Sequence, residues 1–229
     1  MKCLLCGSGI KNELTLKQLL AWQPVQDHQV CQVCWGRFEW ITGAACRGCG
    51  HPQTTTELCG QCQEWQQQTG FLLVNRSLLH YNEALHDFMQ QYKFVGDYRL
   101  RQVFAAPLQA MIATVSADVI VPIPVTPATW KERGFNQVTG MLSHCDWKPL
   151  IETRAHHKQE RQSHKNRQER LATKQPFEMV GAALAQTPIN GKRVLLVDDV
   201  YTTGRTLYHA AALCRSYHPS QIESITLAR

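Results

Sequence analysis

The chain has 229 residues, of which 44% are apolar and 18% are charged, a composition that excludes an intrinsically disordered protein. No stretch approaches the ~18 consecutive apolar residues that a membrane-spanning helix needs, and the N-terminus lacks the features of a signal peptide, so we expect a cytoplasmic protein. The formal net charge is +6, but two Zn²⁺ ions held by eight thiolates would reduce it to about +2. Overall charge is therefore weak evidence for a nucleic-acid partner.

Four cysteine pairs dominate the first 70 residues. Two residues separate the cysteines of each pair, a spacing that lets one tight turn aim both sulfurs at one metal ion, and two such pairs complete a tetrahedron. If the cysteines were isolated redox or buried thiols, the same two-residue spacing would have to occur four times by coincidence. We predict a double zinc ribbon over residues 1–70, with two structural Zn²⁺ sites formed by Cys3, Cys6, Cys31, Cys34, Cys46, Cys49, Cys59 and Cys62.

The way in which these pairs combine is open. Sequential pairing, with the first two pairs at one metal and the last two at the other, closes the shorter loops and costs less chain entropy, so we prefer it to a crossed arrangement. His28 and His51 are alternative ligands, which we interpret as surface residues. Zinc ribbons bind nucleic acid, bind protein or brace a fold, and the spacing does not distinguish these uses.

Strands and helices alternate after residue 70. We predict one or two short strands within residues 71–81 and further strands over residues 118–124, 193–199 and 222–228. The predicted helices cover residues 82–94 and 98–115, the second bent or ended near Pro107, and others begin near residues 134 and 206. This alternation predicts an α/β fold over residues 71–229, with a mainly parallel sheet covered on both faces.

Residues 152–175 form a basic segment between the last two predicted βα units. It contains seven Lys or Arg against three Glu, together with three His and almost no apolar residues. A mobile, anion-binding loop over a ligand site and a solvated helix face are both compatible with this composition.

A polar string directly follows the apolar run at residues 194–197. Such a run is typical of a buried parallel strand, and open α/β sheets bind ligands at the carboxyl ends of their strands. Carboxylates accept hydrogen bonds from sugar hydroxyls and hold Mg²⁺, whereas hydroxyls and a glycine at a helix start suit a phosphate. A capped βα turn is the simpler alternative, and the full pattern disfavours it. The candidate residues are Asp198, Asp199, Thr202, Thr203, Gly204 and Thr206.

The stretch VLLVDDVYTTGRT at residues 194–206 resembles the phosphoribosyl pyrophosphate (PRPP) binding motif of type I phosphoribosyltransferases. The resemblance implies that Asp198 and Asp199 hold the ribose hydroxyls, that Mg²⁺ accompanies PRPP, and that the fold is of the phosphoribosyltransferase type. It also implies that the 5′-phosphate is surrounded by Thr202, Thr203, Gly204 and Thr206.

A second stretch, VPIPVTPATWKERGFNQV at residues 121–138, resembles the segment that carries the pyrophosphate loop in those enzymes. The implied pyrophosphate region contains Pro124, Arg133, Asn136 and Gln137. The basic segment matches the family's flexible loop only in part: Gln162 and Arg170 have the family's spacing, but Lys165 stands at its leucine position and Thr173 at its asparagine position. Gln159 and Arg167 have the same spacing, so the register of the match is open.

RGFNQ at residues 133–137, YKF at residues 92–94 and the cysteine pairs are together similar to the ComF family of competence proteins, a likeness that covers nearly the whole chain. The resemblance implies a role in natural transformation, in which the protein assists the uptake of single-stranded DNA beside a helicase-like translocase. That partner would bring it to the inner face of the membrane, and PRPP or a related phosphoribosyl compound is the implied ligand.

Thr202 stands where purine-type phosphoribosyltransferases carry an aspartate that serves as general base. Phosphoribosyl transfer depends mainly on positioning and charge stabilisation, so this departure leaves catalysis open, and we identify no nucleobase-recognition element. Two alternatives accompany the competence function. One is an active phosphoribosyltransferase of nucleotide metabolism with an unknown acceptor. The other, ranked last because the aspartates and the glycine are present, is a zinc-ribbon nucleic-acid adaptor with a vestigial transferase fold.

Overall fold

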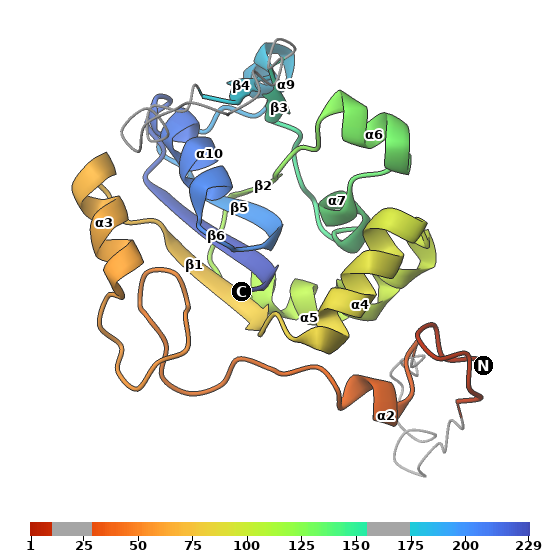
Figure 1. The fold of residues 1–229 in the computed structure, drawn as a ribbon. Coiled ribbons are helices and arrows are strands. Elements are labelled where there is room, and N and C mark those ends of the chain that lie inside the picture. Colours follow the sequence, from red (N-terminus) through yellow and green to blue (C-terminus); the bar gives the residue numbers. More distant parts are fainter. Residues whose placement is uncertain (11–28, 155–174) are drawn as a thin grey trace, which may run out of the picture.

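The computed structural model describes residues 1–10, 29–154 and 175–229. Its centre is a four-stranded parallel sheet with the strand order β1-β6-β5-β2 (Figure 1). The strands are β1 (Val74–Leu79), β2 (Val119–Pro122), β5 (Arg193–Val200) and β6 (Gln221–Ala228). β5 lies inside the sheet, between β6 and β2, and its residues 194 to 197 are all buried. The predicted parallel sheet is confirmed.

Alternate residues of β5 face two separate cores. Leu195 and Val197 pack with α4 (Glu83–Gln90), α5 (Arg101–Ala113) and α7 (Gln137–Met141). Val194 and Leu196 pack on the opposite side, which α10 (Arg205–Arg215) covers. Figure 1 shows α10 on one side of the sheet and the other three helices across from it. Because both faces are covered, β5 consists of a continuous apolar run rather than an alternating one.

Three predicted elements end differently in the structure. The helix predicted over residues 82–94 is α-helical only to Gln90 and continues as one π-helical turn, η1 (Gln91–Val95). The helix predicted over residues 98–115 begins as a 3₁₀ turn, η2 (Tyr98–Leu100), and α5 then runs through Pro107 without ending there. The strand predicted over residues 118–124 shortens to β2, an edge strand in which a proline is tolerated.

The remaining elements are short. α6 (Pro127–Arg133) joins β2 to α7, while β3 (Ile151–Thr153) and β4 (Phe177–Met179) pair as a two-stranded antiparallel sheet, and α9 (Gly181–Gln186) follows. The basic segment lies almost entirely outside the described residues, between the ends of β3 and β4. Within the described ranges, no helix is both long enough and apolar enough to cross a membrane.

The cysteine-rich segment contains α2 (Gln32–Trp35) and α3 (Gly60–Thr69), and each packs on a different face of the α/β unit. The Trp35 ring stacks on Phe104 of α5 with a centroid distance of 5.8 Å. The Trp65 ring stacks on Tyr208 of α10 at 4.3 Å and an interplanar angle of 9°. Both halves of the segment thus share core packing with the α/β unit, and a domain boundary near residue 70 stays a prediction.

Candidate functional site

The two motif aspartates lie at the carboxyl end of β5 and are buried, with exposed fractions of 8% for Asp198 and 7% for Asp199. Asp198 Oδ1 accepts a hydrogen bond of 2.9 Å from the Asp199 N–H, and Asp199 Oδ1 accepts one of 2.7 Å from the Val200 N–H. Burial, followed by the neighbouring Asp199 charge, raises the pKa of Asp198 above its usual range. A fully ionised pair therefore needs a cation beside it.

Lys93 of η1 provides that cation. Its Nζ forms an ion pair with Asp199 Oδ2, to which Gln137 Nε2 also donates a hydrogen bond of 2.8 Å. The hydroxyl of Tyr92, in the same π-helical turn, donates to the Gln137 carbonyl at 2.9 Å. Single π-helical turns are frequent at functional sites. Here the π-helical turn and the start of α7 both contact the Asp199 carboxylate.

The predicted pyrophosphate region lies between β2 and α7. Pro124 follows β2 and is partly buried. Asn136 caps α7 by accepting a hydrogen bond of 2.8 Å from the Val138 N–H, and its Nδ2 donates to the Ile123 carbonyl at 2.9 Å. Both polar ends of Asn136 thus bind backbone, so this residue positions α7 against the end of β2.

Arg133 closes the same region from the end of α6. Its Nη1 donates to Gln137 Oε1 at 3.0 Å, and its guanidinium lies over the Phe94 ring at 5.3 Å from the centroid. Gln137 therefore bridges Arg133 to Asp199 through the two ends of its amide. Of the predicted pyrophosphate residues, Gln137 hydrogen-bonds Asp199 directly, and Arg133 is connected to it through Gln137.

The loop at residues 201–204 turns at Gly204, which has a φ of 78° and caps the N-terminus of α10. A Cβ at Gly204 would overlap the hydroxyl of buried Tyr201, so both the backbone and the available space require glycine. Thr202, Thr203 and Thr206 are exposed. Within the described residues, no hydrogen bond uses the N–H groups of residues 202 to 204. Free N–H groups at a helix start suit an anion.

A cleft of about 700 Å³ opens beside Asp199, a volume usual for small-molecule sites. It joins the second half of the cysteine-rich segment to the ends of β1, β5 and β6 and to η1. The lining residues are His51, Pro52, His80, Tyr81, Lys93, Asp199, Val200, Tyr201, Thr202 and Arg229.

Two buried side-chain atoms, Arg133 Nε and the Tyr201 hydroxyl oxygen, have no hydrogen-bond partner among the described residues. Unpaired buried polar atoms are rare in native structures. Tyr201 also lines the cleft beside Asp199, and Arg133 is connected to Asp199 through Gln137.

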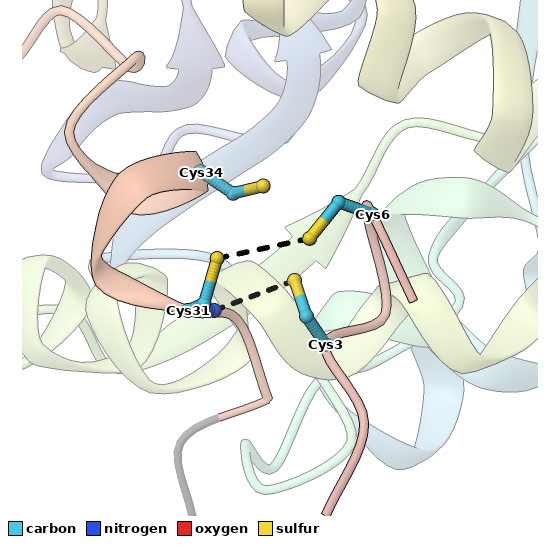
Figure 2. A group of neighbouring side chains, drawn as sticks. All are labelled: Cys3, Cys6, Cys31 and Cys34. Atoms are coloured by element: carbon cyan, nitrogen blue, oxygen red, sulfur yellow. Dashed lines mark hydrogen bonds between the residues drawn. The ribbon is translucent and has the colours of Figure 1, made fainter. Parts of the chain in front are cut away.

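The first cysteine cluster consists of Cys3, Cys6, Cys31 and Cys34, whose side chains point toward one another (Figure 2). All four sulfurs lie within 4.8 Å of one another, and those of Cys6 and Cys31 are 3.8 Å apart. Four Zn–S bonds of about 2.3 Å in a tetrahedron separate the sulfurs by about 3.8 Å. The cluster therefore fits a structural Zn²⁺ site.

The second cysteine cluster consists of Cys46, Cys49, Cys59 and Cys62. Cys46 and Cys62 have sulfurs 3.7 Å apart, and those of Cys49 and Cys59 are 3.6 Å apart, which again matches a Zn²⁺ tetrahedron. A hydrogen bond from the Cys62 thiol is the main cause that lowers the pKa of Cys49 to about 5, which favours a thiolate. The two clusters correspond to the sequential combination of the cysteine pairs.

Several residues of this site were not singled out from the sequence. Lys93 occurs in the YKF string, but nothing in the spacing connects it with an aspartate more than a hundred residues later. Tyr201 stands inside the motif, yet an aromatic residue there gives no indication of its place beneath Gly204. Arg229 reaches the cleft because β6 lies beside β5, a strand order that periodicity does not reveal.

The cysteine clusters predict two Zn²⁺ ions per chain. Cys31→Ser and Cys59→Ser should each reduce the metal content to one ion, because each removes one ligand from a different cluster. Metal analysis of the purified proteins by mass spectrometry checks this. Cys145→Ser, which lies in neither cluster, is the matched control and should retain two ions; loss of both ions from either single variant would contradict two independent sites.

The raised pKa of Asp198 predicts a stability cost that grows with pH. An acid whose folded pKa exceeds its unfolded value binds more protons in the folded state, so stability falls as pH rises through that interval. Asp198→Asn keeps the acceptor oxygen and removes the charge. It should resist urea better than the original protein at pH 7.5, and this advantage should shrink as the pH is lowered, because the Asp198 carboxyl of the original protein then takes up its proton. Exposed Asp146→Asn serves as the control; an advantage independent of pH would contradict the assignment.

Two family models match the chain. A double zinc ribbon domain matches residues 1–63, and a phosphoribosyl transferase domain matches residues 116–229. The competence protein ComFC of Streptococcus pneumoniae is 35% identical, with 100% of both chains covered, and ComFC of Bacillus subtilis is 32% identical over 99% of this chain and 94% of that protein. The DNA utilization protein YhgH of Escherichia coli is 29% identical over 80% of this chain and 83% of its own length. Given this similarity along the full length and the presence of both domains, the chain belongs to the ComF family of competence proteins.

Proposed function

We propose that the protein binds PRPP, or a related phosphoribosyl compound, at the end of β5, and that this binding serves the handling of incoming single-stranded DNA. The observation that carries the proposal is the buried aspartate pair, followed directly by a glycine turn with free N–H groups at the start of α10. Carboxylates suit a sugar diol and free N–H groups suit a phosphate, and a phosphoribosyl group contains both.

The proposed ligand extends in two directions from the aspartates. Asp198 and Asp199 accept hydrogen bonds from the ribose hydroxyls, and the 5′-phosphate occupies the turn formed by Thr202, Thr203, Gly204 and Thr206. The pyrophosphate lies toward Arg133, because a guanidinium group suits phosphate oxygens and this one is connected to Asp199 through Gln137. The carboxylate donor set also fits Mg²⁺, which prefers oxygen ligands and would neutralise part of the pyrophosphate charge.

Lys93 compensates the charge of the buried Asp199 carboxylate through an ion pair. When the ligand binds, its ribose hydroxyls donate to Asp199 and take over part of the charge compensation that Lys93 provides. Lys93 then lies next to the negative charges of the ligand. A cation fixed in this position favours a ligand with several phosphates.

A binding role ranks ahead of phosphoribosyl transfer. Thr202 offers no carboxylate base, and among the residues that the structure describes, the cleft lining contains no amide side chain with which to read a neutral nucleobase. Transfer would release pyrophosphate from PRPP, so a pyrophosphate-release assay with candidate acceptors distinguishes an active transferase from a PRPP-binding protein. A zinc-ribbon adaptor with a vestigial fold would bind no PRPP at all.

Single-stranded DNA is the proposed second partner. Relatives carry the names competence protein and DNA utilization protein. Next to the site, Phe94, Tyr98 and Trp130 are exposed aromatic residues on η1, η2 and α6, and Arg133 and Arg101 lie over the rings of Phe94 and Tyr98. Exposed rings with adjacent cations are the chemistry on which unpaired bases stack. A helicase-like translocase at the inner face of the membrane would deliver such a strand.

Asp199→Asn should weaken the binding of PRPP with Mg²⁺ by about ten- to a hundredfold, because hydrogen bonds to a charged acceptor contribute about 1.5–3 kcal/mol. Isothermal titration calorimetry on the zinc-loaded protein measures this directly. Asp146→Asn, at an exposed carboxylate far from β5 in sequence, should bind like the original protein. Equal affinities of the original protein and Asp199→Asn would contradict the proposed site.

Phe94→Ala should weaken the binding of a fluorescently labelled oligothymidine by roughly fivefold or more, since stacking of a base on an aromatic ring contributes about 1–3 kcal/mol. Val95→Ala, which shortens the neighbouring exposed apolar residue, is the matched control. Fluorescence anisotropy at increasing salt should also show affinity falling roughly tenfold or more over a fourfold increase. A flat salt response, or equal affinities of the two variants, would contradict the proposed contact.

A further inference from the structure

The second cysteine cluster lies next to the proposed phosphate loop. Cys59 caps α3 and Cys62 lies in its first turn. One turn later on the same helix, Trp65 donates a hydrogen bond of 2.8 Å from its indole N–H to the Thr203 carbonyl. Its ring also stacks flat on Tyr208 of α10. The helix that contributes two of the four cysteines thus holds the middle of the loop.

Arg229 connects the same cluster to the start of the loop. Its Nη1 donates to the Cys49 carbonyl at 3.1 Å, and its Nη2 donates to Gln61 Oε1 at 3.4 Å. Cys49 is a member of one cysteine pair of this cluster, and Gln61 lies between the two cysteines of the other pair. The guanidinium lies over the Tyr201 ring at 4.8 Å from the centroid. Arg229 therefore contacts both cysteine pairs and the first residue of the loop.

The loop is anchored at its start, where the Tyr201 N–H donates a hydrogen bond of 2.8 Å to the Ala228 carbonyl of β6. Beyond Tyr201, the side chains of Thr202 and Thr203 are exposed, and the turn at Gly204 closes over the Tyr201 ring. β6 and Arg229 thus fix the first residue of the loop, and Trp65 holds its middle. The segment that carries this cluster also lines the cleft, through His51 and Pro52, which lie two and three residues after Cys49 in the chain.

The first cysteine cluster provides an internal comparison. Trp35, at the end of its helix α2, stacks on Phe104 and packs with Trp40, and the cluster belongs to the core formed by α4 and α5. The two clusters have the same chemistry and comparable aromatic packing. They differ in what they contact: α5 in one case and the loop at residues 201–204 in the other.

We propose that the second cysteine cluster is part of the ligand site, with Trp65 and Arg229 as positioning residues that couple metal occupancy of this cluster to the conformation of residues 201–204. This proposal rests on the proposed function for the ligand, but the coupling itself does not require PRPP. Because coupling between two sites is reciprocal, metal in this cluster strengthens phosphoribosyl binding, and the ligand in turn tightens the metal. The first cluster has no such effect.

The first experiment measures hydrogen exchange of the peptide that covers residues 200–207 in the full-length protein. Emptying the second cluster with Cys59→Ser should increase exchange there, whereas emptying the first with Cys31→Ser should not. Trp65→Phe keeps the ring on Tyr208 and removes only the indole N–H, so it should increase exchange of the same peptide while both Zn²⁺ ions remain bound. Trp35→Phe is the matched control at the first cluster and should leave the peptide unchanged.

The second experiment uses PRPP with Mg²⁺ as the probe. Trp65→Phe should weaken its binding by about two- to tenfold, the usual contribution of one hydrogen bond, and Trp35→Phe should not. PRPP should slow the loss of Zn²⁺ to a chelator from the second cluster in the Cys31→Ser protein, and not from the first cluster in the Cys59→Ser protein.

Exchange that is unchanged in both Cys59→Ser and Trp65→Phe would overturn the coupling, whatever the protein binds. Absence of PRPP binding to the original protein, with loop exchange still dependent on the second cluster, would instead overturn the proposed ligand and support the coupling. Should Cys59→Ser fail to fold, Trp65→Phe alone decides the question, because its zinc content reports whether the cluster is intact.

Discussion

Two adjacent carboxylates buried at the end of the central strand impose the main constraint on this structure. An ionised carboxylate loses several kcal/mol of hydration when it is buried, and it must recover this from partners at close range. Backbone N–H groups donate to one oxygen of each aspartate, and Lys93 and Gln137 both bind the other oxygen of Asp199, Oδ2. The aspartates thus dictate where η1 and α7 must lie.

The surrounding elements follow from this requirement. The π-helical turn extends α4, pairs Lys93 with Asp199 and places the Tyr92 hydroxyl on the Gln137 carbonyl. Asn136 then fixes α7 against the end of β2. These side chains hold the two aspartates in a buried position that desolvation alone would disfavour. Burial of the aspartates lowers the free energy of unfolding, and the packing of the helices around them offsets this cost.

The sequence predicts the elements whose chemistry is local. The spacing of the paired cysteines and of the polar residues after β5 is visible in the sequence itself. The apolar run of β5 likewise indicates a strand that is buried on two faces. Contacts between distant segments are not predictable in this way. Nothing near Lys93 indicates Asp199, and nothing near Trp65 indicates Thr203, because these pairs arise from strand order and helix packing. The π-helical turn and the passage of α5 through Pro107 are tertiary outcomes that override local propensity.

The strand order also bears on how the protein is made. β6 comes last of the four sheet strands in the chain but lies between β1 and β5. While the chain is being synthesised, β1 therefore has no partner in the sheet until residues 221–228 have left the ribosome, although more than a hundred residues follow it first. Parallel pairing over such separations is slow and leaves strand edges open. The free edge of β1 contacts residues 39–41, which precede it in the chain, through two backbone hydrogen bonds, so this edge is covered by residues that are made earlier. Arg229, which lines the cleft beside Asp199, arrives only after the final strand.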